Sequence, residues 1–152
     1  MTLKILECIS ILLSTLVAGA VWGPWLALSR SVATFKPEVF VAVAQRMIVN
    51  LEPVMTLLIP ASMLSIVSVV FISYNQRPRT AYLNVAGFGF FIVAVFMSVL
   101  VQIPIINKMR TWTESTLPDD WQQLRDQWKA VQVIRIVATF TGLAFLVIGA
   151  II

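Results

Sequence analysis

Residues 128–152 read WKAVQVIRIVATFTGLAFLVIGAII, a stretch with the length and composition of a membrane span and with a charge inside it. From residue 131 to residue 152 the run is almost wholly apolar, and about 20 such residues suffice for a helix to cross a bilayer. Arg135 interrupts this run. A charged side chain at that depth is costly, so it generally faces the protein interior and marks a functional site. The stretch therefore predicts a transmembrane helix with an inward-facing arginine.

Three further apolar segments are long enough to span a bilayer, roughly at residues 5–28, 53–74 and 82–106. The 152-residue chain is 59% hydrophobic and only 12% charged, with a mean hydropathy of +0.92, which is typical of a membrane protein. Backbone polar groups must be satisfied within the hydrocarbon, so these spans are expected to be helices. We predict an all-α integral membrane four-helix bundle, one domain over residues 1–152, with both termini on one side.

The two long connections contain helix signals of their own. In residues 29–52, Pro37 followed by Glu38 predicts an additional helix, which either lies in the membrane interface or leads into the second span. In the third connection, Pro118, Asp119 and Asp120 predict a helix start. This last helix is expected to continue into the fourth span and so to project from the membrane.

Lysine and arginine are concentrated on the side of the long connections. The positive-inside rule therefore favours a cytoplasmic location for these connections, and we expect a bacterial inner-membrane protein. Histidine is absent and Cys8 is the single cysteine, which excludes an internal disulfide, zinc-finger spacing and histidine-ligated haem. We expect no metal and no cofactor. The net charge of +4 comes from scattered residues and does not indicate nucleic-acid binding.

Polar and small residues recur every three or four positions in each span, which predicts inward-facing stripes. The first span contributes Glu7, Ser10, Ser14, Ala18 and Trp25; the second contributes Glu52, Thr56 and Met63; the third contributes Asn84, Gly87, Phe91, Ala94, Ser98 and Gln102; and the last helix contributes Trp121, Arg125, Trp128, Gln132, Arg135, Thr139, Gly142 and Gly149. Because Glu52 and Arg135 begin their spans on the same side, we expect them to pair. Such a pair either fixes the helix register or belongs to a ligand site, in which case both residues are catalytic candidates.

All five tryptophans lie toward the long connections. They either form an interfacial belt or line a cavity under the segment 113–124. For the second alternative, helical spacing selects a set of ligand-binding candidates: Trp112, Trp128, Asn107, Arg110, Gln132 and Arg135.

The runs QIPIINKMRTW (102–112) and DWQQLRDQW (120–128), followed by Ile134-Arg135, resemble the anthrone oxygenase-like family of small four-helix membrane proteins. Family members show a D-W-x-x-L-R-x-x-W segment and then H-x-I-R. The resemblance implies a four-helix fold and, for a few fungal members, oxidation of polycyclic anthrones by O₂ without an obvious cofactor. This chain has Gln132 where the family pattern has histidine, and glutamine is neither a base nor a metal ligand near neutral pH.

Three classes of function follow. The first is a membrane protein that binds an oxygenated aromatic such as a polyphenol or quinone, with cofactor-independent oxygenase-like turnover left open. The second is a non-catalytic subunit, or a lipid- or quinone-binding partner, of a larger membrane complex. The third is a small transporter with Glu7 or Glu52 as the coupling carboxylate, although Glu7 beside Lys4 is more typical of a surface pair. The expected partners are the lipid bilayer and a hydrophobic aromatic molecule, with a homo-oligomer or a complex partner left open.

Overall fold

The computed structural model describes residues 2–113 and 115–152, and in these residues every regular element is helical. In chain order the elements are α1 (Thr2–Leu28), α2 (Pro37–Gln76), α3 (Pro78–Met97), the π-helical turn η1 (Ser98–Gln102), α4 (Ile103–Arg110) and α5 (Trp121–Ile151). Because α3, η1 and α4 follow one another without a break, the chain forms four helical rods. Each rod is long and apolar enough to cross a membrane.

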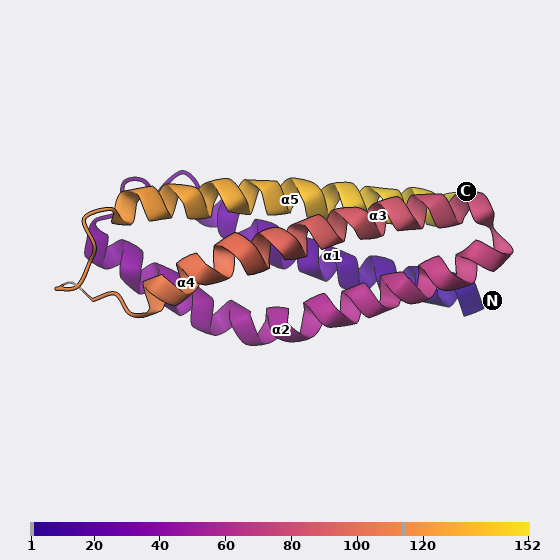
Figure 1. Ribbon diagram of the computed structural model, residues 1–152, viewed down its shortest axis with the longest axis horizontal. Helices are drawn as coiled ribbons and strands as arrows, with labels where there is room; N and C mark the ends of the chain where they lie inside the picture. The colour runs from indigo at the N-terminus through magenta and orange to yellow at the C-terminus, as the bar shows by residue number, and fades with distance from the viewer. Residues whose placement is uncertain (1, 114) are drawn as a thin grey trace.

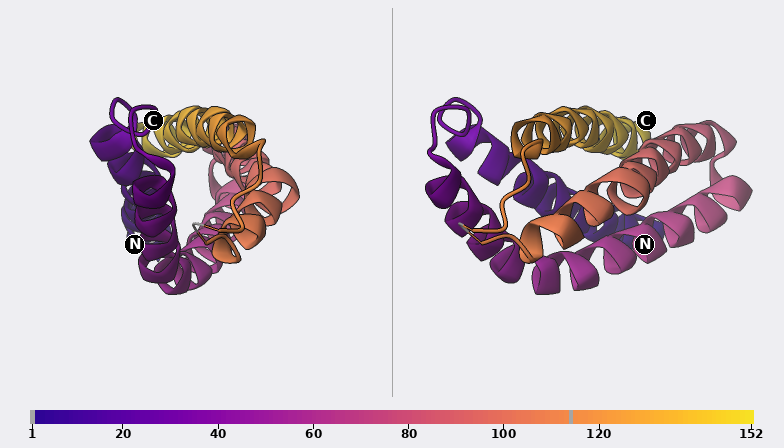
Figure 2. Two further views of the ribbon diagram at one scale, coloured as in Figure 1. Left: turned by 90° about the vertical axis from the view of Figure 1, so that its left-hand side faces the viewer. Right: turned by 60° about the vertical axis from the view of Figure 1, so that its left-hand side comes forward.

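The four rods pack as a bundle around a common axis (Figure 2). Helix α1 packs against α2 and α5, and α3 packs against the same two neighbours. Both termini lie at one end of the bundle (Figure 1), where the ammonium of Lys4 donates a hydrogen bond of 2.6 Å to the carbonyl of Ala150. The predicted four-helix bundle and its same-side termini are confirmed.

The outer surface of the bundle is apolar along its length. Large hydrophobic side chains are exposed on all four rods, among them Leu12, Leu57, Phe71, Phe96 and Val137. In water such a surface would drive aggregation, whereas lipid solvates it. The polar stripes of α1, α3 and α5 mostly point inward, as their spacing predicted.

Helices α3 and α5 approach closely because glycines meet at their contact. A Cβ atom added to Gly87 would lie 2.9 Å from the carbonyl oxygen of Gly142, and one added to Gly142 would lie 2.8 Å from the ring of Phe91. Gly149 meets the side chain of Asn84 in the same way. This contact aligns α5 and so sets the direction in which its polar residues point.

Helix α2 runs without interruption from Pro37 to Gln76. Of the two alternatives for the segment after Pro37, the structure has the second, a helix that leads into the span, and no separate interfacial helix is formed. Pro53 and Pro60 lie inside α2, where each lacks the N–H of a regular helical bond and crowds the preceding turn. Accordingly, α2 bows outward near its middle (Figure 1).

Helix α5 begins at Trp121, later than the predicted start at Pro118. Residues 118–120 form a turn, in which the Trp121 N–H bonds the Pro118 carbonyl at 3.1 Å, and the side chain of Asp120 makes no cap hydrogen bond. The predicted helix start at Pro118 is therefore wrong, and Asp119 and Asp120 precede the helix. The continuation of this helix through the fourth span is confirmed.

Candidate functional site: an apolar cavity with a buried arginine

A cavity of about 420 Å³ lies inside the half of the bundle that is opposite the chain termini. Its wall is mostly aliphatic and comes from all four rods. Prolines inside two of the helices, Pro24 of α1 and Pro60 of α2, lie in this wall. Because proline bends a helix away from regular packing, these residues give a physical reason for the space between the rods.

The π-helical turn η1 contributes Ser98, Val99 and Gln102 to the cavity wall. Pro104 has no N–H to offer the Leu100 carbonyl, and the Ile103 N–H instead bonds the carbonyl of Ser98, five residues back. Such π-helical bulges are frequent at functional sites. Here the turn places Gln102 inside the bundle, where its side chain is 9% exposed.

Arg135 lies at the inner end of the cavity, where it contacts two glutamine side chains. Its Nη1 donates a hydrogen bond to Oε1 of Gln102 and another, of 3.0 Å, to Oε1 of Gln132. The Gln102 amide nitrogen also donates to Gln132 Oε1 at 3.3 Å, and the Gln132 amide nitrogen donates to the carbonyl of Val21 at 2.6 Å. The cluster thus joins α5 to η1 and to α1 through hydrogen bonds between buried groups.

The positive charge of Arg135 has no counter-charge in the described part of the chain. No carboxylate there lies within ion-pair distance of its guanidinium, and the Nε of Arg135 has no hydrogen-bond partner. Arg135 is only 7% exposed. A buried charge that only neutral amides solvate is unfavourable unless an anion joins it. The site is therefore chemically suited to a negatively charged oxygen.

The predicted pair of Glu52 with Arg135 is wrong. Glu52 instead forms an ion pair with Arg110 of α4, and both side chains are about half exposed. Glu52 directly precedes Pro53, in the part of α2 that bows outward, so its carboxylate lies near α4 and not near α5. Both partners line the cavity, where they form its polar rim.

Five of the six predicted ligand-binding residues line this cavity: Trp128, Asn107, Arg110, Gln132 and Arg135. The sixth, Trp112, packs in a hydrophobic cluster with Phe40, Met109 and Trp121. Among the tryptophans, Trp128 is thus the one in the cavity wall. Trp112 and Trp121 belong to this cluster, against which Leu117 also packs.

Two residues that shape this site, Gln102 and Gln45, were not among the predicted site residues. Gln102 lies on a predicted polar stripe, and its amide contacts Arg135. Gln45 donates hydrogen bonds to the carbonyls of Met109 and Trp112, at 3.0 and 2.9 Å, and so fixes the end of α4. A polar residue at an inward position was the available signal for Gln102. No sequence pattern singled out Gln45.

The fold and the site define a class: a four-helix membrane bundle with a buried cation in the wall of an apolar cavity. The family model described as Anthrone oxygenase matches residues 50–145, more than half of the chain. The matched region includes Glu52, the π-helical turn and the Arg135 cluster. The chain belongs to the anthrone oxygenase family, as its motifs indicated. No curated protein and no solved structure matches the chain.

Proposed function

We propose that the chain binds a flat, oxygenated polycyclic molecule in this cavity, and that Arg135 holds an acidic oxygen of the ligand as an anion. The ligand is a phenol or an enol, which becomes an oxyanion when it loses its O–H proton. The observation that carries this proposal is the buried Arg135 guanidinium, which faces the cavity without a carboxylate partner in the described chain.

The size and chemistry of the cavity support the same ligand class. Small-molecule sites generally measure about 300–1,000 Å³, with apolar walls and a few polar groups, and this cavity falls within that range. Trp128 offers an aromatic face to a flat ring system. Arg135 keeps its proton at any relevant pH and offers several donors in one plane. Gln132 and Gln102 hold the guanidinium in place.

The family membership supports the proposal in a further way. An anthrone is the keto form of a hydroxylated tricycle, and its conjugate base carries negative charge on oxygen. A protein that stabilises this base increases the amount of the electron-rich form that reacts with O₂. Gln132 accepts no proton near neutral pH, so we assign to the cluster the binding and stabilisation of the anion and not the removal of the proton.

Tryptophan fluorescence in mild detergent tests the proposal. The probes are 1,8-dihydroxyanthraquinone, which is stable to O₂, and anthracene, which has the same ring skeleton without oxygen. We expect saturable quenching by the dihydroxy compound, with Arg135→Gln weakening its binding about 10- to 100-fold, because a hydrogen bond to a charged group contributes about 1.5–3 kcal/mol.

The matched control is Arg125→Gln. Arg125 is also buried on α5, but its guanidinium lies over the Trp121 ring and outside the cavity wall. This variant should bind the dihydroxy compound like the unmodified chain. Equal affinity of the unmodified chain for the two probes would contradict the role of Arg135. So would an equal loss of affinity for the dihydroxy compound in Arg135→Gln and Arg125→Gln.

A further inference from the structure

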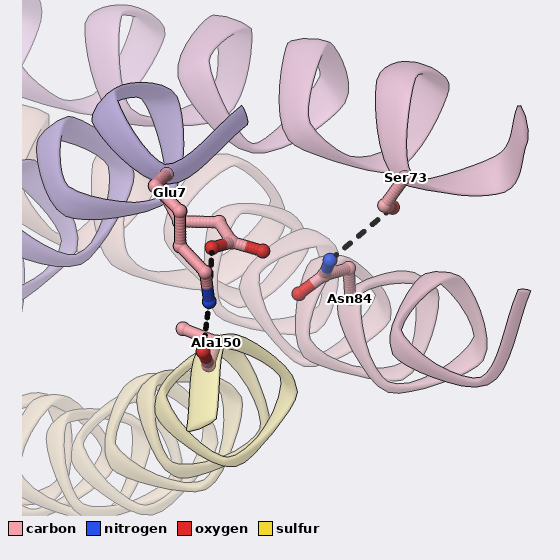
Figure 3. A network of polar contacts seen from close by, with 5 residues as sticks. Glu7, Ser73, Asn84 and Ala150 are labelled. Carbon is pink, nitrogen blue, oxygen red and sulfur yellow. Dashed lines mark hydrogen bonds and ion pairs between the residues drawn. The ribbon is translucent and has the colours of Figure 1, made fainter. Parts of the chain in front are cut away.

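A second group of buried polar side chains lies at the other end of the bundle. Glu7 of α1 is only 3% exposed, and neither of its carboxylate oxygens has a hydrogen-bond partner in the described residues. The ammonium of Lys4 lies 3.2 Å from one of these oxygens and is itself half exposed. The Glu7 carboxylate points into the bundle toward Asn84, which donates to the hydroxyl of Ser73 (Figure 3). The expected surface pair of Lys4 and Glu7 is therefore wrong for Glu7, whose carboxylate is buried.

Buried hydroxyls continue from Glu7 along the axis of the bundle. Ser10 lies one helical turn further on, is 1% exposed, and makes no hydrogen bond within the described chain. Ser14 is fully buried and shares a hydrogen bond of 3.1 Å with Ser62 of α2. The polar groups of Glu7, Ser10 and Ser14 thus form a line along the inward face of α1.

This line reaches the Arg135 cluster through a small cavity. The small cavity has a volume of about 10 Å³, and its polar lining residues are Ser62, Ser98, Arg135 and Thr139. A volume of that size is about the minimum that accommodates one water molecule. Ser98 and Arg135 also line the large cavity, so Arg135 lies between the two spaces.

Helix packing alone does not account for these residues. Small polar side chains stabilise membrane helices by hydrogen bonds across the interface, as Ser14 and Ser62 do. The hydroxyl of Ser10 and the carboxylate of Glu7 make no such bond, although both are buried.

We propose that Glu7, Ser10, Ser14 and Ser62 form a proton-transfer path from the terminal end of the bundle to the small cavity beside Arg135. A hydroxyl accepts a proton on one side while it donates its own on the other. Neighbouring positions on one helix face lie about 5–6 Å apart between Cβ atoms, a gap that one water molecule bridges. Chains of this kind are a known use of polar residues inside membranes.

That a bound ligand releases its proton into this path rests on the proposed function, whereas the existence of the path does not. When the ligand O–H bond breaks, its electron pair stays on the oxygen, which becomes the anion beside Arg135. The proton passes along the hydroxyls to the Glu7 carboxylate, which becomes a carboxylic acid. It then leaves to the solvent on the side of Lys4. No oxidant or reductant takes part in this transfer.

Arg135 closes the path to free protons when no ligand is bound. A fixed cation repels a hydronium ion that enters from the large cavity, as positive side chains do in proton-excluding pores. Replacing Arg135 by a neutral residue should therefore open a continuous route from the rim of the large cavity to Glu7.

The test uses sealed liposomes that contain the full chain and an internal pH-sensitive dye, with a potassium diffusion potential as the driving force. The unmodified chain should admit protons no faster than protein-free liposomes. Arg135→Gln should admit them at least fivefold faster, and Arg135→Gln with Ser10→Ala should return to the unmodified rate. The matched control adds Ser68→Ala to Arg135→Gln and should stay leaky, because Ser68 is an exposed residue that bonds only the carbonyl of Leu64.

The proposed path is wrong if Arg135→Gln admits protons no faster than the unmodified chain. It is also wrong if adding Ser10→Ala leaves the proton leak of Arg135→Gln unchanged. If Arg135→Gln does not fold, proton release by the single variant Ser10→Ala tests the path instead. After mixing with 1,8-dihydroxyanthraquinone, Ser10→Ala should show unchanged fluorescence quenching and at least fivefold slower proton release, and an unchanged release rate overturns the path. Failure of the unmodified chain to bind the probe would count against the proposed function only, because the leak measurement needs no ligand.

Discussion

Gln132 links Arg135 of the same helix to the backbone of α1. Its amide oxygen accepts a hydrogen bond from the guanidinium at 3.0 Å, and its amide nitrogen donates to the carbonyl of Val21 at 2.6 Å. A neutral amide can do both at once, whereas a carboxylate could only accept. The arrangement orients the arginine and leaves its positive charge unneutralised.

Replacing Gln132 by glutamate should therefore block the site without unfolding the protein. The new carboxylate supplies the counter-charge that Arg135 lacks in the described chain, and it competes with an anionic ligand. We expect Gln132→Glu to bind 1,8-dihydroxyanthraquinone at least tenfold more weakly, while in detergent the new ion pair with Arg135 offsets the lost hydrogen bond to the Val21 carbonyl. Fluorescence titration and thermal unfolding measure the two effects. Full affinity in this variant would contradict an anion-binding role.

Replacing Gln132 by histidine should add the proton acceptor that the family pattern contains. One imidazole nitrogen can donate to the Val21 carbonyl as the amide does, and the other takes the place of the amide oxygen beside Arg135 as an acceptor that can take a proton. We expect Gln132→His to accelerate O₂-dependent oxidation of an anthrone by 10²-fold or more over the unmodified chain, within the usual range for general-base catalysis. Oxygen consumption measures the rate, and Gln132→Asn, which has no basic nitrogen, is the control. Equal rates in both variants would argue against a base at this position.

The ion pair at the cavity rim should be energetically independent of Arg135. Double-mutant cycles with Glu52→Gln measure the coupling in the free energy of unfolding. We expect the cycle with Arg135→Gln to be additive within about 0.5 kcal/mol, because the two residues share no partner. The cycle with Arg110→Gln should give the 0.2–1 kcal/mol that is usual for an exposed pair. A coupling above about 1 kcal/mol between Glu52 and Arg135 would restore the pairing that the structure contradicts.

The contact between α3 and α5 should not tolerate a methyl group. Gly87→Ala would bring Cβ to 2.9 Å from the Gly142 carbonyl oxygen, a backbone atom that cannot move away by changing rotamer. We expect a loss of about 1–3 kcal/mol in the free energy of unfolding. Gly89→Ala, two residues away, meets nothing within 4 Å and should be neutral or stabilising by up to about 1 kcal/mol. Equal effects at the two positions would show that the close approach is not what Gly87 provides.

The sequence predicted the fold well because a bilayer allows few alternatives. Apolar length set the number of spans, and three-to-four-residue spacing placed Gln132, Arg135 and Thr139 on an inward face, where the structure has them. The position of Asn107 and Arg110 at the cavity also followed from helical periodicity. These inferences needed only local geometry.

The rest depended on how the helices bend and on which partner each charge meets. The outward bow of α2 takes Glu52 to Arg110, and spacing along one helix says nothing about such a bend. Trp112 packs in the hydrophobic cluster because the chain leaves the helix after Arg110, a boundary that the apolar pattern did not mark. Glu7 lies near a chain end and beside Lys4, which is the pattern of a surface pair, yet neighbouring helices bury its carboxylate.

The absorption spectrum of bound 1,8-dihydroxyanthraquinone shows whether the chain holds this ligand as an anion, because the phenol and its anion absorb at different wavelengths. At a pH where the free compound is neutral, we expect the spectrum of the anion on the unmodified chain and the spectrum of the neutral form on Arg135→Gln. A neutral spectrum on both chains, with equal affinity, would contradict the claim that Arg135 binds an oxyanion in this cavity.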